Sequence, residues 1–252
     1  MLSIDINCDM GEGFPDDEGL MSYISSANIA CGVHAGSIDI MRRTIELALR
    51  HDIAVGAHPS YPDRANFGRI DQIGSGLNLK DLPVIIFDQV TQIGKICSEY
   101  GTQLHHLKPH GALYNRAARD PWVSSCICKA VADWSPSLIL YGLSGSEMEK
   151  QAGCHHIKFV QEAFADRTYR EDGSLTPRNQ PNALIEDVHE AAERVLQMLR
   201  RGTVTTTSGK EIFIKTGTIC IHGDGGHALE FAKSVRDTLY RNGIAIMRPA
   251  FG

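Results

Sequence analysis

Several features that would place a chain in a large functional class are missing from this sequence. No basic start is followed by a long apolar segment, which argues against a signal peptide and against a membrane span. Lysine and arginine do not cluster, and the formal net charge is −5, so nucleic acid is not expected as a partner. These absences predict a cytoplasmic protein that binds neither membranes nor nucleic acid.

Cysteine pairs and interdomain linkers are also lacking. The seven cysteines form no CxxC pair and are odd in number, so we expect reduced thiols that mostly pack as small hydrophobes. Cys8 and Cys31 flank polar motifs and are the two most plausible exceptions. Because no proline-, glycine- or serine-rich stretch divides the chain, residues 1–252 are predicted to form one catalytic domain.

What the chain does contain is a regular alternation of short apolar runs and helical patterns. The runs predict strands at residues 2–7, 27–31, 53–57, 103–107, 138–141, 156–160 and 218–222. Helices are predicted at residues 17–25, 39–51, 82–100, 111–118, 122–134, 146–152, 183–201 and 226–242, and a last strand at 244–247. This order needs parallel strands and right-handed crossovers, and it favours an α/β fold with a seven-stranded (β/α) barrel.

Two local signals refine this scheme. Ser37 is a plausible N-terminal cap for the helix predicted at residues 39–51. Ser208 and Gly209 stand between two β-favouring runs, which predicts a small β-hairpin over residues 203–214. We expect this hairpin to decorate the barrel and not to form a second domain.

Acid and base side chains stand beside glycines at the ends of the apolar runs. In barrels, catalytic groups project from the carboxyl ends of the strands, so this placement indicates an enzyme. Asp9 and Glu12 form a carboxylate pair suited to acid and base roles, although a single carboxylate in a turn is as often a helix cap or a loop residue. His34 and His58 end consecutive predicted units, with small neighbours that leave the imidazoles accessible.

A metal centre is one possible use of these side chains. Asp9, His34 and His58 could make an open site, because one carboxylate and two imidazoles leave positions for water and substrate. Three ligands on three loops carry no fixed spacing, and the same groups serve equally well as metal-free acids and bases. The sequence leaves the presence of a metal open.

The segment around Pro109 adds a lysine and a histidine. Strand-like alternation across Pro109 can place Lys108 and His110 on one face, where the lysine offers a charge for an oxyanion or phosphate and the histidine can transfer a proton. The plainer alternative is a lysine that faces solvent. His105 and His106 begin the predicted strand at its remote end, so we expect them to lie outside the site.

Further candidates follow the last two strands. His222 and Asp224 add an imidazole and a carboxylate, with Asp224 as a helix cap equally plausible. The segment from Glu162 to Pro181 is too charged for the core and is expected to form a loop over the site. Arginines in such a loop can bind a carboxylate by bidentate pairing. Candidates for this role are Arg69, Arg167 and Arg178.

Six motifs, in order, carry a resemblance to a known family. They are IDINCDMGEG, SSANIACGVHAGS, VGAHPSYPDRANFGR, HLKPHGALYN, QEAFADRTYREDGSLTPRNQPNALI and CIHGDGGHALEFA. Together they resemble the LamB/YcsF family from about Ser3 to the last helix. Val33 and Ser37 stand where the family pattern has Phe and Asp, which leaves His34 intact.

The resemblance implies a barrel similar to the glycoside hydrolase and deacetylase superfamily. It also implies ATP-dependent cleavage of 5-oxoproline (pyroglutamate) to L-glutamate by a multi-subunit 5-oxoprolinase, with subunits B and C as partners. The sequence has no GxxxxGK[ST] phosphate loop. ATP is therefore expected to be used by the complex through the partner chains, with this chain hydrolysing the lactam.

Roles within this expected reaction follow from residue chemistry. Asp9 would act as general base with Glu12 assisting, His34, His58 and His110 as acid and polarising groups, and Lys108 on the oxyanion or phosphate. Residues expected to bind the substrate are Asn7, Arg69, Glu162, Arg167, Arg178, His222 and Asp224. Two other functions stay open: a stand-alone metal-dependent amide hydrolase or carbohydrate deacetylase, and a non-catalytic subunit that presents 5-oxoproline to other chains.

Overall fold

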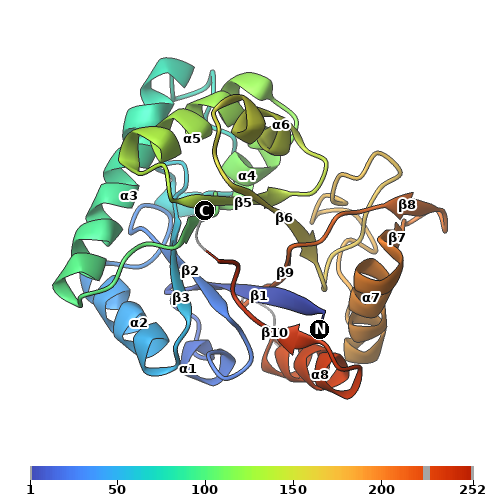
Figure 1. The fold of residues 1–252 in the computed structure, drawn as a ribbon. Coiled ribbons are helices and arrows are strands. Elements are labelled where there is room, and N and C mark those ends of the chain that lie inside the picture. The colour runs from blue at the N-terminus through green and yellow to red at the C-terminus, as the bar shows by residue number, and fades with distance from the viewer. Residues whose placement is uncertain (1, 224–227, 251–252) are drawn as a thin grey trace.

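Parallel strands close into a barrel in the computed structural model, which describes residues 2–223 and 228–250. Within these residues seven strands follow one another around the barrel, and the last pairs with the first to close it (Figure 1). In barrel order they are β1 (Ser3–Met10), β2 (Ser26–Ala30), β3 (Ala54–His58), β4 (His106–Leu107), β5 (Ile139–Leu143), β6 (Phe159–Phe164) and β9 (Thr218–Ile221). The predicted seven-stranded (β/α) barrel is confirmed.

The helices form a ring outside the strands (Figure 1). They are α1 (Asp17–Leu20), α2 (Ile38–Arg50), α3 (Leu82–Glu99), α4 (Gly111–Ala117), α5 (Pro121–Trp134), α6 (Glu147–Cys154), α7 (Val188–Arg201) and α8 (Ala228–Arg241), with 3₁₀ helices η1 (Arg64–Asn66) and η2 (Leu79–Asp81). Ser37 caps α2 as predicted, because its hydroxyl accepts a hydrogen bond from the Ile40 amide. No helix in the described part of the chain has the length and apolar character needed to cross a bilayer.

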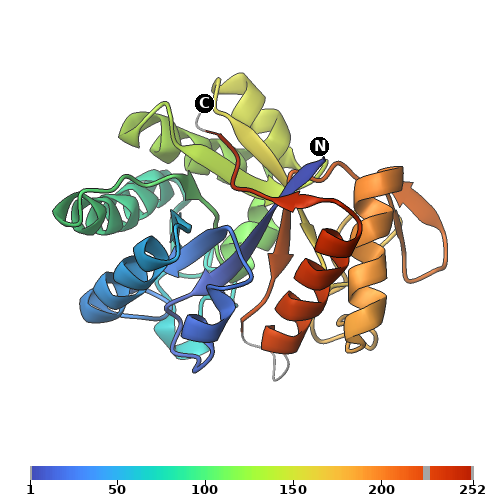
Figure 2. The same cartoon turned by 60° about the horizontal axis from the view of Figure 1, so that its bottom comes forward.

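Two small elements lie outside the closed barrel (Figure 2). The hairpin of β7 (Thr203–Thr205) and β8 (Glu211–Phe213) is antiparallel and forms a separate two-stranded sheet next to α7, as predicted. The short strand β10 (Ala245–Ile246) pairs in parallel with the beginning of β1. It therefore extends the sheet at the amino-terminal end of the barrel, away from the carboxyl ends of the strands.

Strand β6 differs from its prediction in a way that matters for the site. The apolar run predicted a strand at residues 156–160, but the strand begins at Phe159 and continues to Phe164. Glu162 therefore lies inside the barrel wall with no exposed surface, and Arg167 just beyond the strand is also buried. The expectation that charge keeps this whole segment out of the core is wrong, because a buried lysine pairs with Glu162.

The interior of the barrel is polar because β1 alternates. Its even-numbered residues from Ile4 to Met10 are apolar and pack in the hydrophobic core, while Asp5, Asn7 and Asp9 make buried polar contacts. Asp5, near the amino-terminal end, accepts hydrogen bonds from three hydroxyl groups, those of Ser25, Ser26 and Thr218. Polar side chains thus run along the barrel to the site, and each is satisfied by a neighbouring strand.

Candidate active site

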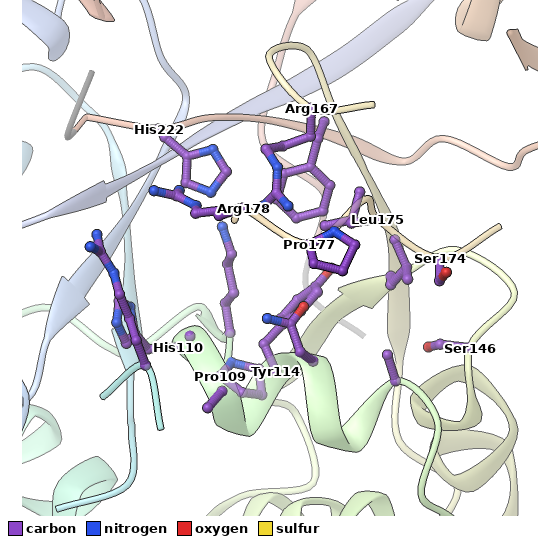
Figure 3. A pocket seen from close by; sticks show the side chains of 18 of the residues that line it. Pro109, His110, Tyr114, Ser146, Arg167, Ser174, Leu175, Pro177, Arg178 and His222 are labelled. Atoms are coloured by element: carbon purple, nitrogen blue, oxygen red, sulfur yellow. The ribbon is translucent and has the colours of Figure 1, made fainter. Parts of the chain in front are cut away.

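A cavity of about 600 Å³ opens at the carboxyl ends of the barrel strands (Figure 3). Acid and base side chains line one part of it, and arginines line another. The acid and base group comprises Asp9, Glu12, His58, Lys108 and His110, and the arginines that bear on the argument are Arg69, Arg167 and Arg178. The structure therefore brings these predicted residues from separate segments of the chain to one pocket.

Lys108 is the buried cation of the site. Its Nζ lies 2.9 Å from Asp9 Oδ1 and 2.9 Å from Glu162 Oε1, and it donates to Asn7 Oδ1 at 3.2 Å. Burial alone would lower the pKa of the Lys108 ammonium, but Asp9, with further contributions from Cys220 and Glu162, raises it well above its usual value. The solvent-facing alternative for this lysine is excluded, since its exposed fraction is 2%.

Asp9 stands between Lys108 and the histidines. Its Oδ1 accepts hydrogen bonds from Lys108 and from the Asn28 amide at 2.8 Å, while Oδ2 lies 3.3 Å from His58 Nε2. Burial would raise the pKa of the Asp9 carboxyl, yet the neighbouring charges of His58 and Lys108 bring it well below its usual value. Asp9 is therefore ionised at neutral pH, and it also lines the cavity.

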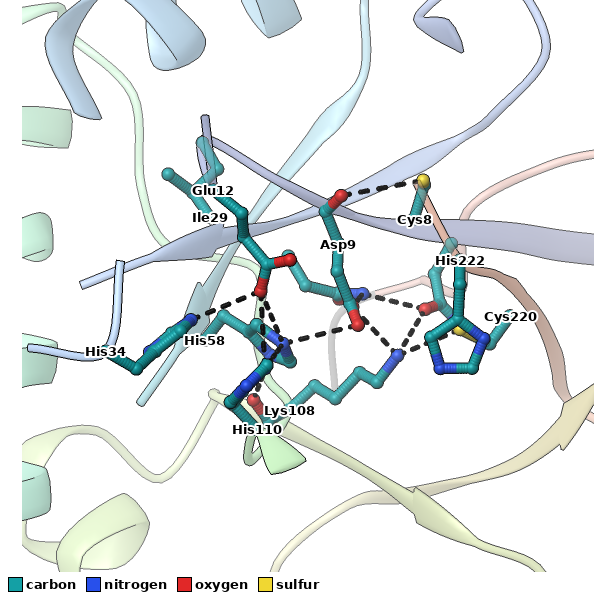
Figure 4. Close-up of polar contacts among 12 residues, drawn as sticks. Cys8, Asp9, Glu12, Ile29, His34, His58, Lys108, His110, Cys220 and His222 are labelled. Atoms are coloured by element: carbon teal, nitrogen blue, oxygen red, sulfur yellow. Dashed lines mark hydrogen bonds and ion pairs between the residues drawn. The ribbon is translucent and has the colours of Figure 1, made fainter. Parts of the chain in front are cut away.

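Glu12 lies at the centre of three imidazoles (Figure 4). Its Oε1 is 3.2 Å from His34 Nε2, 3.2 Å from His110 Nδ1 and 3.7 Å from His58 Nε2. Burial raises the pKa of Glu12, but hydrogen bonds from His110 and His34 outweigh it and lower the pKa to about 2. Burial lowers the pKa of His34 to about 4, so that ring is neutral at pH 7.

Backbone carbonyls fix two of these rings. His58 Nδ1 donates to the Lys108 carbonyl at 2.8 Å, and His110 Nε2 donates to the Phe67 carbonyl at 2.9 Å. The chain can approach His110 this closely because residue 68 is glycine: its φ is +63°, and a Cβ there would lie 2.2 Å from the Ser60 hydroxyl. The loop of residues 59–68 thereby orients the imidazoles.

The groups that could hold a metal differ from the predicted set. Glu12, His34, His58 and His110 each offer a ligand atom, and these atoms lie within 4.8 Å of one another. Asp9 belongs instead to a second such group, which also contains Cys220 and His222. The predicted trio of Asp9, His34 and His58 is therefore divided between two adjacent clusters.

The substrate-binding candidates fall in different places. Arg69 and Arg178 line the cavity from its rim, and the Arg69 guanidinium lies over the Phe67 ring. Arg167 is 5% exposed and donates to the Thr176 carbonyl at 2.6 Å, and its buried Nε has no hydrogen-bond partner among the described residues. His222 also lines the cavity, with its Nδ1 2.8 Å from Asp166 Oδ2.

The remaining substrate-binding candidates do not line the cavity in this way. Asn7 and Glu162 are fully buried and contact Lys108 from behind, so the structure places them as its supports. Asp224 lies outside the described residues. Asn7 also donates to the Thr218 hydroxyl at 2.8 Å, which ties this support to strand β9.

Sequence reasoning missed two residues next to the site. Cys220 Sγ lies 3.1 Å from Lys108 Nζ, whereas the sulfurs of Cys8 and Cys31, the thiols singled out in the sequence, contact backbone carbonyls. His106 was expected to lie outside the site, but its Nε2 donates to Asn28, which in turn donates to Asp9. Inward alternation along β9 and β4 is the sequence signal that could have found both.

Comparison with known proteins was made over the whole chain. The model of the LamB/YcsF family matches residues 4–250. A Bacillus cereus (strain B4264) protein, named as the 5-oxoprolinase subunit designated A, is 44% identical, with 99% of this chain and 100% of that protein aligned. A Bordetella parapertussis protein of the same name is 46% identical, with 97% and 98% aligned.

Solved structures agree with the sequence relatives. The lactam utilization protein from Thermus thermophilus superposes with a TM-score of 0.91 at 36% identity, covering 98% of this chain and 99% of that one. The catalytic domain of a peptidoglycan N-acetylglucosamine deacetylase from Eubacterium rectale shares the fold alone, with a TM-score of 0.51 at 11% identity, covering 98% and 88%. By its motifs and by its similarity over nearly its whole length, this chain belongs to the LamB/YcsF family.

Proposed function

We propose that this protein hydrolyses the lactam ring of 5-oxoproline to give L-glutamate, as one subunit of an ATP-dependent 5-oxoprolinase. The observation that carries the proposal is the buried Asp9–Lys108 pair at the wall of a cavity that also holds three arginines. Relatives at 44% and 46% identity over nearly the whole chain are named as a 5-oxoprolinase subunit, which supports this substrate.

The chemistry explains why the site combines a carboxylate, an ammonium and imidazoles. A γ-lactam is a poor electrophile, and phosphorylation of its amide oxygen would activate the ring carbon. Asp9 then takes a proton from water as the water adds to that carbon, while Lys108 stabilises the negative charge on the oxygens. The ring C–N bond breaks as an imidazole of the cluster protonates the nitrogen, and a second water releases phosphate from the acyl phosphate.

Arginine is suited to the α-carboxylate of the substrate, which takes no part in ring opening. Arg178 is exposed at the rim of the cavity, whereas Arg167 already donates to a backbone carbonyl. A planar guanidinium binds a carboxylate through two parallel hydrogen bonds. We therefore assign the α-carboxylate to Arg178, with Arg167 and Arg69 contributing positive charge.

Removing this contact should weaken substrate binding. We expect Arg178→Ala to raise KM for 5-oxoproline about 10- to 100-fold with a smaller change in kcat, since a charged hydrogen bond contributes about 1.5–3 kcal/mol. Initial rates over a range of 5-oxoproline concentrations measure both constants. Arg50→Ala, on the exposed end of α2, is the control. An unchanged KM in Arg178→Ala would remove the assignment.

Phosphorylation is assigned to partner chains. The sequence has no phosphate loop, and the name of the relatives marks each of them as one subunit of a larger assembly. We propose that subunits B and C bind ATP and deliver the activated lactam to the cavity described here. ATP is then a cosubstrate of the complex, with hydrolysis in this chain.

Glutamate release from 5-oxoproline tests the proposal directly. We expect the purified chain alone to release none, and the chain with subunits B and C and ATP to release glutamate and phosphate. Omission of ATP, or of either partner, is the control and should abolish release. Absence of glutamate in the complete mixture would refute the proposal.

One rival function has a specific observation in its favour. The cluster of Glu12 with three histidines suits a metal-dependent amide hydrolase or carbohydrate deacetylase that acts alone. Such an enzyme would hydrolyse an acetylated sugar without ATP or partner chains. Activity of the isolated chain on N-acetylglucosamine oligomers therefore separates the rival from the proposed function.

A further inference from the structure

The hydrogen bonds of His58 and His110 determine where each ring carries its proton. A backbone carbonyl can only accept, so His58 Nδ1 must carry the hydrogen that goes to Lys108, and His110 Nε2 the hydrogen that goes to Phe67. In the neutral rings the other nitrogens, His58 Nε2 and His110 Nδ1, then bear lone pairs. These two atoms lie only 3.0 Å apart.

A third acceptor faces the same point. Glu12 Oε1 is 3.2 Å from His110 Nδ1 and 3.7 Å from His58 Nε2. Three electron-rich atoms at such short separations repel one another unless a positive charge lies between them. Either an extra proton or a metal ion must supply this charge.

The spacing of the three atoms fits a metal ion of the zinc class. A tetrahedral zinc ion with bonds of about 2.0–2.1 Å holds its ligand atoms about 3.3–3.4 Å apart, and the observed separations of 3.0, 3.2 and 3.7 Å bracket that value. Two histidines and a glutamate leave the fourth position open, as in catalytic zinc sites. All three side chains line the cavity, so the open position faces the pocket.

His34 has a different part in this arrangement. Its ring stacks on that of His110 with centroids 3.9 Å apart and planes at 8°, so the two rings cannot both direct an in-plane lone pair at one ion. His34 Nε2 instead donates to Glu12 Oε1 at 3.2 Å. It is a positioning residue that orients the carboxylate, as outer hydrogen bonds do around metal sites.

The charge of the surroundings also favours a cation. Asp9, Glu12 and Glu162 place three carboxyl groups with little or no exposed surface around one buried ammonium, that of Lys108. Buried charges are stable only when they are paired. A divalent cation held by Glu12 and His58 would also lie near Asp9, whose Oδ2 is 3.3 Å from His58 Nε2, and would offset the excess of negative charge.

We propose that His58 Nε2, His110 Nδ1 and Glu12 Oε1 bind a first-row divalent transition-metal ion, with zinc the best match to the donor set. Bound there, the ion would act as a Lewis acid toward a substrate oxygen or a water molecule. Asp9, beside His58, remains the group that receives the proton of the water. The inference rests on the proposed function for this role only, and not for the binding itself.

Metal titration of the tag-free, chelator-treated full chain tests the site. We expect one equivalent of Zn²⁺ to bind by calorimetry, and one equivalent of Co²⁺ to give visible absorption bands that added Zn²⁺ abolishes. Glu12→Gln and His110→Gln, checked for folding by circular dichroism, should bind Zn²⁺ at least about 100-fold more weakly, since even outer-shell changes cost about 10- to 100-fold. His34→Gln should fall in that smaller range.

A matched control separates this site from adventitious binding. His51→Gln removes an exposed histidine at the end of α2 and should leave the affinity unchanged. Lack of stoichiometric binding by the wild type, or equal affinity in His110→Gln, would overturn the proposal and leave a shared proton in the cluster. Because binding is measured without substrate, its failure would not touch the glutamate-release test, and failure of that test would not touch the site.

Discussion

Replacing Lys108 by methionine is expected to lower kcat for glutamate release about 10²- to 10³-fold and to destabilise the fold by roughly 3–5 kcal/mol. Methionine keeps the length of the side chain but removes the ammonium, so Asp9 and Glu162 lose the cation that lies 2.9 Å from each. An uncompensated buried charge is costly, and the oxygens of the substrate lose their positive partner. Urea unfolding and initial rates of the reconstituted complex measure the two effects.

A surface lysine provides the comparison for this prediction. Lys129 also lies 2.9 Å from an aspartate, Asp133, but both side chains are largely exposed on α5. Water and salt screen such a pair, so Lys129→Met should change stability by less than about 1 kcal/mol and leave kcat unchanged. Wild-type stability of Lys108→Met would show that the buried ion pairs do not form in solution.

The barrel could be predicted because each of its seven strands is a short apolar run, and the runs alternate with helical patterns. A helix such as α2 buries Met41, Ile45 and Ala48 on one face, and this spacing is visible in the sequence. The strand ends then placed Asp9, His58 and Lys108 near one another without any knowledge of distances, because the carboxyl ends of parallel strands meet at one end of a barrel. Periodicity and topology together located the site.

The pairing of the polar groups could not be predicted in the same way. Glu162 looked like a loop residue because a charge in an apolar run normally ends the run, and only its distance of 2.9 Å from Lys108 explains its burial. The division of the histidines depends on ring orientation, which is fixed by carbonyls at Phe67 and Lys108 that are distant in sequence. Such contacts are set by tertiary packing, on which local sequence carries no information.

Asp9→Asn is expected to reduce kcat about 10²- to 10⁴-fold, the usual contribution of a positioned general base, while the fold stays intact. Asparagine keeps an oxygen that can accept hydrogen bonds from Asn28 and Lys108, and Lys108 keeps Glu162 as its charged partner. The amide cannot take a proton from water. Glutamate release by the reconstituted complex and thermal unfolding of the variant measure the two expectations.

The control for Asp9→Asn lies on the same strand. Asp5 is buried four residues earlier on β1, and its carboxylate accepts hydrogen bonds from three hydroxyl groups away from the cavity lining. Asp5→Asn should cost about 1–3 kcal/mol of stability through these bonds but preserve kcat. If both variants kept full activity, Asp9 would not be the base; if both lost it equally, the loss would report damage to the barrel. Loss in Asp9→Asn alone assigns the proton transfer to the carboxyl end of β1.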